Sequence, residues 1–172
     1  GRAEPASVPV PPGLWGHAGD LEGPGYDLEA ARKIIEAKGL TGTKLTLWAL
    51  PVQRDYNPNG RRMAEIMAAD LEKIGIEPSI VTYEWAEYLK LSRDPGRDGA
   101  VSGGWIADTI DPENFLASMF TCGNVGGTNR SQWCDEDYDR LIEKASRSPA
   151  REERIELYQQ AQEIFKEQAP WA

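Results

Sequence analysis

The amino-acid sequence predicts an α/β fold, with an open β-sheet flanked by helices and additional helices toward the C-terminus. Two observations carry this prediction. Between residues 44 and 105, short segments rich in β-branched and aromatic residues alternate with segments of helical periodicity, in a β-α-β-α-β series. The last third of the chain then has helical periodicity. Strands that alternate with helices form parallel sheets, so the predicted strands run parallel.

Length and composition indicate one compact domain. The chain has 172 residues, of which 40% are apolar, and these include six Trp and six Tyr, so it has ample material for a core. The formal net charge is −9, and Lys and Arg are scattered rather than clustered, which argues against nucleic acid or an anionic membrane surface as a partner. No apolar run approaches the roughly 18 residues that a membrane span needs.

Both ends of the sequence suggest a piece of a longer protein. The start, Gly1 to Glu4, is neither an initiator methionine nor a signal peptide, and the final QAPWA stops where a following strand is expected. Residues 1–26 contain VPVPPG and several glycines, which predict an extended leader over the domain surface. Residues 27–172 are then expected to form one α/β lobe.

The first expected elements are a helix over residues 27–38, capped by Asp27 and ended by Gly39, and a strand over residues 44–50. A second helix is expected to start with Asn57 as its N-cap and Pro58 at its first position, and to end at Gly75. The apolar stripe of this helix is predicted to be core and consists of Met63, Ile66, Met67, Leu71 and Ile74.

A strand over 78–83, a short helix over 84–91 and a strand over 98–105 complete the series. Three helices follow, over 112–120 after an Asp111 cap, 135–147, and 149–168 after a Ser148 cap. The residues of the last helix expected to face inward are Ile155, Tyr158, Ile164 and Phe165.

The two cysteines, Cys122 and Cys134, bracket a Gly-, Asn- and Ser-rich stretch with no periodicity of its own. A disulfide that closes this loop is favoured over two buried thiols, and it points to an oxidising compartment. A zinc site is not expected, because the single histidine, His17, lies in the leader, far from both cysteines.

Two opposite charges, Arg54 and Asp108, each follow a predicted strand and precede a predicted helix. In an open α/β sheet this carboxyl edge is where ligands bind, so the pair is interpreted as a clamp for a small zwitterion. The alternative for Arg54 is a surface ion pair with Asp55, and for Asp108 a turn of the Asx type. Asp111 already caps the next helix, which leaves Asp108 without an obvious structural role.

Three aromatic residues, Tyr56, Trp85 and Trp105, lie near these charges in the predicted order of elements. Each taken alone is more typical of a core or a helix-packing face, but together they suggest the walls of a pocket. An enzyme is a remote alternative, in which Asp108 and Asp111 act as the two carboxylates of a hydrolase. The sequence contains neither a phosphate loop nor a dinucleotide fingerprint, so we expect no catalytic residue and no cofactor.

Long strings of the sequence closely resemble a known family. They include LTLWALPVQRDYNPNG, VTYEWAEYLKL, GGWIADTIDPENF, NRSQWC and ELYQQAQEIFKEQAPW. Across nearly the whole chain they are similar to the periplasmic dipeptide-binding proteins of bacterial ABC importers, within the family 5 extracellular solute-binding proteins. Those proteins have two lobes that close over the ligand, and this chain resembles one of them, of the periplasmic-binding-protein type II kind.

The resemblance implies roles for individual residues. The arginine of the PVQR string, here Arg54, takes the peptide carboxylate, and the aspartate after GW-x-x, here Asp108, takes the α-ammonium. Tyr56 and Trp85 match aromatic positions that line the pocket, and Trp105 matches less closely. The implied partners are a dipeptide or short peptide, the second lobe and an inner-membrane ABC permease; the implied location is the periplasm, or the outer surface of a Gram-positive cell.

The sequence departs from the family pattern at two points. It reads ADTIDP where the family commonly reads GDNGDP, and Asp55 stands where a proline often follows the arginine. A carboxylate beside Arg54 would weaken anion binding or alter the choice of ligand. Relatives with similar strings take up glutathione, haem or other small solutes, so these ligands are alternatives to a dipeptide.

Overall fold

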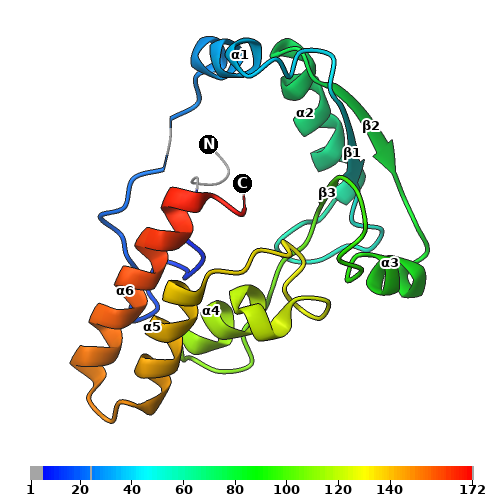
Figure 1. Cartoon of the computed structure of the whole chain (residues 1–172). Helices are drawn as coiled ribbons and strands as arrows, with labels where there is room; N and C mark the ends of the chain where they lie inside the picture. The colour runs from blue at the N-terminus through cyan, green and yellow to red at the C-terminus, as the bar shows by residue number, and fades with distance from the viewer. Residues whose placement is uncertain (1–5, 24, 172) are drawn as a thin grey trace. The chain divides into compact units, whose positions relative to one another are not determined.

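The computed structural model describes residues 6–23 and 25–171 (Figure 1). The chain forms two compact units, each with its own core. One unit comprises Gly25–Gly104, and the other comprises Gly1–Pro24 together with Trp105–Ala172. The first contains the β-sheet, and the second contains the C-terminal helices and leader residues 6–23.

The sheet unit has the predicted order of elements. It contains α1 (Leu28–Ala37), β1 (Lys44–Trp48), α2 (Gly60–Lys73), β2 (Glu77–Val81), α3 (Trp85–Leu91) and β3 (Ala100–Val101). The strand order is β2-β1-β3 and both pairings are parallel, with Trp48 opposite Val81 on one side and Val101 on the other. The connection after β1 thus places β2 on one side of β1, and the connection after β2 places β3 on the other side. Ligands of open α/β sheets bind beside such a reversal, at the carboxyl ends of the strands.

The third strand is shorter than predicted. Pairing is confined to Ala100–Val101, followed by one further hydrogen bond of 3.1 Å from the amide of Ser102 to the carbonyl of Trp48. Beyond it come Gly103 and Gly104, which lack side chains to pack on a sheet face. The segment that leads from β3 into the helical unit is thus irregular rather than a continuation of the strand.

Helix α2 begins later than predicted, and its cap is Asn59 rather than Asn57. The side chain of Asn59 accepts a hydrogen bond of 2.9 Å from the amide of Arg62. Asn57 is instead paired with Arg54 by two backbone hydrogen bonds of 3.0 and 3.1 Å, which close a tight turn before the helix. Because the backbone of Asn57 is held in that turn, the first helical hydrogen bond starts two residues later, from the amide of Met63 to the carbonyl of Asn59.

The prediction that the apolar stripe of α2 is core is wrong for its first half. Met63, Ile66 and Met67 are 42%, 48% and 41% exposed. The buried positions of the helix are Gly60 and Ala64, whose small size lets the backbone approach the sheet. A Cβ atom at Gly60 would lie 2.3 Å from the carbonyl oxygen of Leu50, so this position requires glycine.

The helical unit consists of α4 (Glu113–Phe120), a 3₁₀ turn η1 (Cys122–Asn124), α5 (Glu136–Arg147) and α6 (Arg151–Gln168). Helices α5 and α6 pack side by side in Figure 1. Tyr158 and Phe165 are buried as predicted, whereas Ile155 and Ile164 are half-buried. Helix α6 starts two residues later than predicted, because the Ser148 hydroxyl accepts the amide of Ala150 at 3.2 Å rather than a helical amide.

Residues 6–23 of the leader belong to this helical unit, whereas Gly25 and Tyr26 belong to the sheet unit. Val10 is fully buried in the cluster formed by α4, α5 and α6. The carbonyl of Gly16 accepts a hydrogen bond of 2.8 Å from the buried side-chain amide of Gln162 on α6. These leader residues therefore contribute to the core of the unit.

The predicted disulfide is present. Cys122 and Cys134 are bonded, and their Cα atoms lie 4.6 Å apart, within the range that a disulfide permits. The loop that it closes is also held by Asn129, which is fully buried and donates hydrogen bonds to the carbonyls of Thr121 and Trp133.

Candidate ligand-binding site

Arg54 is held at the end of the segment that follows β1. The turn from Arg54 to Asn57 fixes its backbone, and its guanidinium carbon lies 5.0 Å from the ring centroid of Trp85. Its Nη1 donates a long hydrogen bond of 3.4 Å to the carbonyl of Gln53. Among the described residues of the sheet unit Arg54 has no ion pair, so the alternative pairing with Asp55 is not formed.

Trp85 is the first residue of α3, and its ring is itself supported. It stacks on Tyr88 with centroids 6.0 Å apart and an interplanar angle of 17°. Tyr88 is buried, and its hydroxyl donates to the carbonyl of Ser102. A guanidinium over an aromatic face keeps the N–H groups of its edge free to bind a planar carboxylate. The structure thus brings together two of the predicted site residues, Arg54 and Trp85.

Tyr56 lies at the tip of the same turn and is 40% exposed. Its ring covers Gly104, since a Cβ atom at that glycine would lie 2.5 Å from Cε2 of Tyr56. Gly104 is the last residue of the sheet unit, directly before Trp105. The aromatic ring is therefore packed against the segment that follows β3 as well as belonging to the segment that follows β1.

Asp108 projects from the loop between β3 and α4. Its side chain is exposed, and among the described residues of the helical unit its carboxylate has no partner. It forms no Asx turn; instead its backbone amide donates a hydrogen bond of 3.1 Å to Oδ1 of Asn114. The same oxygen accepts a hydrogen bond of 2.8 Å from the indole nitrogen of Trp105.

The carboxylate of Asp111, by contrast, has partners within its own unit. It accepts a hydrogen bond of 3.0 Å from the amide of Glu113, but the N-cap of α4 is Pro112 rather than the predicted Asp111. Its two carboxylate oxygens lie 2.9 and 2.8 Å from Nη2 of Arg154. A carboxylate engaged in this way is poorly suited to act as a general acid or base, which argues against the hydrolase alternative.

Sequence reasoning missed Asn114 and Arg154, which hold this loop. Asn114 directly precedes the apolar residues Phe115 and Leu116, and this contrast is the only local signal of its role. Arg154 lies 43 residues from Asp111, so no local pattern connects the two.

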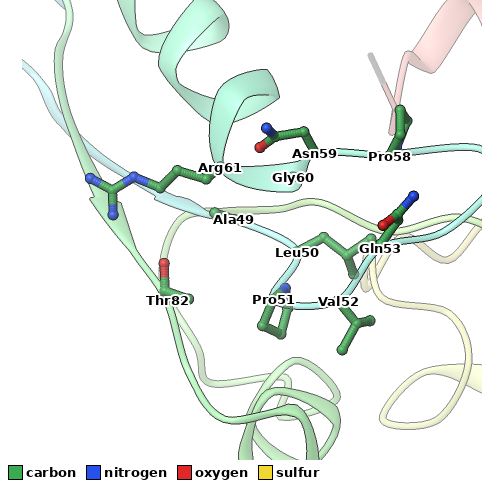
Figure 2. Close-up of a pocket in the computed structure, with 10 residues that line it drawn as sticks. All are labelled: Ala49, Leu50, Pro51, Val52, Gln53, Pro58, Asn59, Gly60, Arg61 and Thr82. Carbon is green, nitrogen blue, oxygen red and sulfur yellow. The ribbon is translucent and has the colours of Figure 1, made fainter.

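A cavity of about 420 Å³ lies beside the carboxyl end of β1 and the start of α2 (Figure 2). Gln53 and Asn59 are among its polar lining residues, and Arg61 is its one charged lining residue. Arg61 is paired with Glu65 at 3.3 Å, and neither Arg54 nor Trp85 lines the cavity. We therefore do not assign the ligand to it. In the described ranges, no group of three or more His, Cys, Asp or Glu residues could hold a metal ion.

Arg54 belongs to the sheet unit, and Asp108 and Trp105 belong to the helical unit. The joint action of the two charges as a clamp therefore stays a prediction. The structure shows the surroundings of each charge separately. The guanidinium of Arg54 is supported by an aromatic ring, and Asp108 lies in a loop fixed by hydrogen bonds.

Comparison with known proteins gives consistent matches. Residues 1–127 match the model of a family described as bacterial extracellular solute-binding proteins, family 5 Middle. The chain is 45% identical over 163 residues to the dipeptide-binding protein of Escherichia coli K12, covering 94% of this chain and 30% of that protein. It is 38% identical over 172 residues to heme-binding protein A of Haemophilus influenzae, covering 99% of this chain and 31% of that protein.

A solved structure has the same fold. The dipeptide-binding protein of Pseudoalteromonas sp. SM9913, in complex with Met-Leu, matches with a TM-score of 0.89 and 36% identity over 96% of this chain and 33% of that one. The chain spans about a third of the length of these relatives. Among its described residues, no helix combines the length and apolar character of a membrane span.

Proposed function

Because the chain belongs to family 5 of the bacterial extracellular solute-binding proteins, we propose that it is the ligand-binding lobe of a protein that captures dipeptides or short peptides for import. The single observation that carries the proposal is the placement of Arg54. Its guanidinium is stacked over Trp85 and has no carboxylate partner among the described residues of its unit. An arginine in this state is available to a carboxylate supplied by a ligand.

In this proposal the two ends of the peptide provide the binding energy. Arg54 holds the C-terminal carboxylate, and Asp108, whose side chain has no partner in its own unit, holds the α-ammonium. Tyr56, Trp85 and Trp105 exclude water from the ion pairs, which strengthens both of them. Peptide side chains make few specific contacts, so peptides of different sequence bind with similar affinity.

The remainder of the longer protein supplies the other half of the enclosure. Binding closes two lobes by a hinge, and the closed form is recognised by an inner-membrane ABC permease that carries the ligand across. The location is the periplasm, in keeping with the extracellular description of the family and with the disulfide. The ligand is bound and released without chemical change.

Haem is the second candidate ligand, because heme-binding protein A of Haemophilus influenzae is 38% identical to the chain. Haem offers carboxylates to Arg54 but has no ammonium group for Asp108. The unpartnered carboxylate of Asp108 therefore favours a zwitterionic ligand over haem.

Isothermal titration calorimetry on the full-length protein tests the proposal. The panel contains a free dipeptide, its N-acetylated and C-amidated forms, glutathione and haem. We expect the free dipeptide to bind most tightly, with each blocked form weaker by about tenfold or more, since each lacks one charge-assisted contact. Tight binding of haem without dipeptide binding would contradict the proposal, and recovery of a hydrolysed dipeptide would support the enzyme alternative.

A further inference from the structure

Only part of the loop that carries Asp108 is anchored by apolar side chains. Side chains alternate along it: Trp105 and Ala107 pack against the helical core, whereas Ile106 is 62% exposed and Asp108 points outward with it. Further along, Ile110 is 82% exposed. Burial alone therefore does not fix the position of the Asp108 carboxylate, and the loop depends on its hydrogen bonds.

One side-chain oxygen holds both ends of this alternating segment. Oδ1 of Asn114 accepts the indole N–H of Trp105 at 2.8 Å and the backbone N–H of Asp108 at 3.1 Å. Asn114 lies in the first turn of α4, whose next residues, Phe115 and Leu116, are buried in the core. The acceptor is thus mounted on a rigid element, and it ties the wall residue Trp105 and the charged residue Asp108 to the same point.

We propose that Asn114 is the positioning residue for the ammonium-binding carboxylate. It does not touch the ligand; it sets the orientation of Asp108 by fixing the backbone amide of that residue and the indole beside it. This inference rests on the proposed function, in which Asp108 binds the α-ammonium. A carboxylate placed in advance loses less conformational freedom on binding, so its contact with the ligand is stronger.

The far end of the loop is fixed independently. Asp111 is bound by Nη2 of Arg154, whose guanidinium lies 5.0 Å from the ring centroid of Trp15. Nη2 also donates a hydrogen bond of 2.7 Å to the hydroxyl of Tyr158. Loss of the Asn114 acceptor therefore frees the segment from Trp105 to Asp108 while the start of α4 stays in place.

The test compares two substitutions at Asn114 in the full-length protein. Asn114→Leu has similar volume and no acceptor, whereas Asn114→Asp keeps an acceptor for both N–H groups. Asn124→Leu is the matched control: Nδ2 of Asn124 donates hydrogen bonds of 2.9 Å to the carbonyl of Ala117 and to the Thr121 hydroxyl, in the same unit but outside the loop.

Two readouts separate positioning from stability. The first is the ratio of affinities for a free dipeptide and its N-acetylated form, measured well below the melting temperature. Asn114→Leu should reduce this ratio about tenfold, toward the value of Asp108→Asn, whereas Asn114→Asp and Asn124→Leu should keep it. The second is the indole N–H resonance of Trp105, which should move upfield in Asn114→Leu and stay near its original position in Asn114→Asp, because a hydrogen-bonded proton is deshielded.

The outcomes are distinguishable. If Asp108→Asn leaves the ratio unchanged, Asp108 does not bind the ammonium, and both the proposed function and this inference fail. If Asp108→Asn lowers the ratio but Asn114→Leu does not, the proposed function stands and the positioning role of Asn114 is wrong. If Asn114→Leu still lowers the ratio in the Asp108→Asn background, its effect does not pass through Asp108, and the inference is again overturned.

Discussion

The guanidinium carbon of Arg54 lies 5.0 Å from the ring centroid of Trp85. This contact orients a cation that has no carboxylate partner among the described residues of its unit. If Arg54 binds a carboxylate as proposed, the planar edge of the guanidinium, rather than its face, is the part expected to meet it. The planar shape of the Arg54 side chain, as well as its charge, should therefore affect the affinity for a ligand.

Arg54→Lys tests that conclusion. Lysine keeps the charge but loses both the flat contact with Trp85 and the paired N–H groups of the fork. We expect the affinity for a free dipeptide to fall about tenfold or more, and the affinity for its C-terminal amide to change little. Calorimetry with the two ligands measures the difference. Equal losses for both would indicate that Arg54 supports the turn and does not bind the carboxylate.

The distance between Arg54 and Asp108 in the ligand-bound protein is a second prediction. A dipeptide places its end charges roughly 6 to 7 Å apart, and each contact adds about 2.7 to 2.9 Å. The guanidinium and the carboxylate should then lie about 8 to 13 Å apart and face one crevice. A crystal structure of the full-length protein with a dipeptide gives this distance. A direct salt bridge between the two residues there would refute the clamp.

Gly60→Ala separates helix propensity from packing. Propensity alone predicts a gain of about 0.5 to 1 kcal/mol at a helical glycine. The structure predicts a loss instead, because the added Cβ would lie 2.3 Å from the carbonyl oxygen of Leu50, a backbone atom. Urea unfolding measures whether the substitution raises or lowers the free energy of unfolding. Gly103→Ala is the control, since nothing lies within 4 Å of its Cβ position, and we expect little change there.

Removal of the disulfide should destabilise the helical unit. Cys122 and Cys134 are separated by 12 residues, and closing a loop of this size contributes about 3 kcal/mol to the free energy of unfolding. The double substitution to serine should therefore unfold at lower urea concentration, and the unreduced chain should show no free thiol when denatured. Titratable thiols in the denatured, unreduced chain would contradict the structure.

Tyr158 makes stability depend on pH in the alkaline range. Burial, with a further contribution from the charge of Asp111, raises the pKa of Tyr158 to about 12, although the nearby Arg154 opposes this rise. Its ordinary pKa is 10.0, so between these values the folded chain keeps a proton that the unfolded chain has lost. The stability contributed by Tyr158 is full below pH 10 and is lost as the pH rises toward 12.

Tyr158→Phe removes the titrating group and serves as the test. Its free energy of unfolding should be lower than that of the original chain near pH 8, because the hydrogen bond from Arg154 is gone. It should then fall less steeply between about pH 10 and 12. Unfolding curves at several pH values measure both effects, and parallel declines of the two proteins would show that another group is responsible.

The sequence predicted helix ends well where they depend on contacts between residues a few positions apart. Asp27 caps α1 as predicted, and Asp135, predicted as the first residue of α5, is its N-cap; each accepts a hydrogen bond from the amide three positions ahead. Asn57 was the wrong choice of cap for α2 because the turn between it and Arg54 competes for its backbone. Two asparagines separated by one residue cannot be told apart without knowledge of that turn.

Longer-range features were not predictable in the same way. An apolar residue repeated at helical spacing shows that a helix is amphipathic, but it does not show which face meets the sheet. In α2 the buried residues are the small Gly60 and Ala64, rather than the large apolar residues of the stripe. The role of Asn114 depends on a hydrogen bond to Trp105, nine residues earlier, which exists only once the loop has folded back on α4.

The outward stripe of α2 also has a chemical consequence. The chain has three methionines, and two of them, Met63 and Met67, are 42% and 41% exposed, whereas Met119 is 5% exposed. A thioether open to solvent is converted by peroxide to a polar sulfoxide, and the buried one reacts slowly. In an oxidising compartment, chemical ageing of this protein would therefore begin on one helix, by turning its apolar stripe polar while the helical core stays intact.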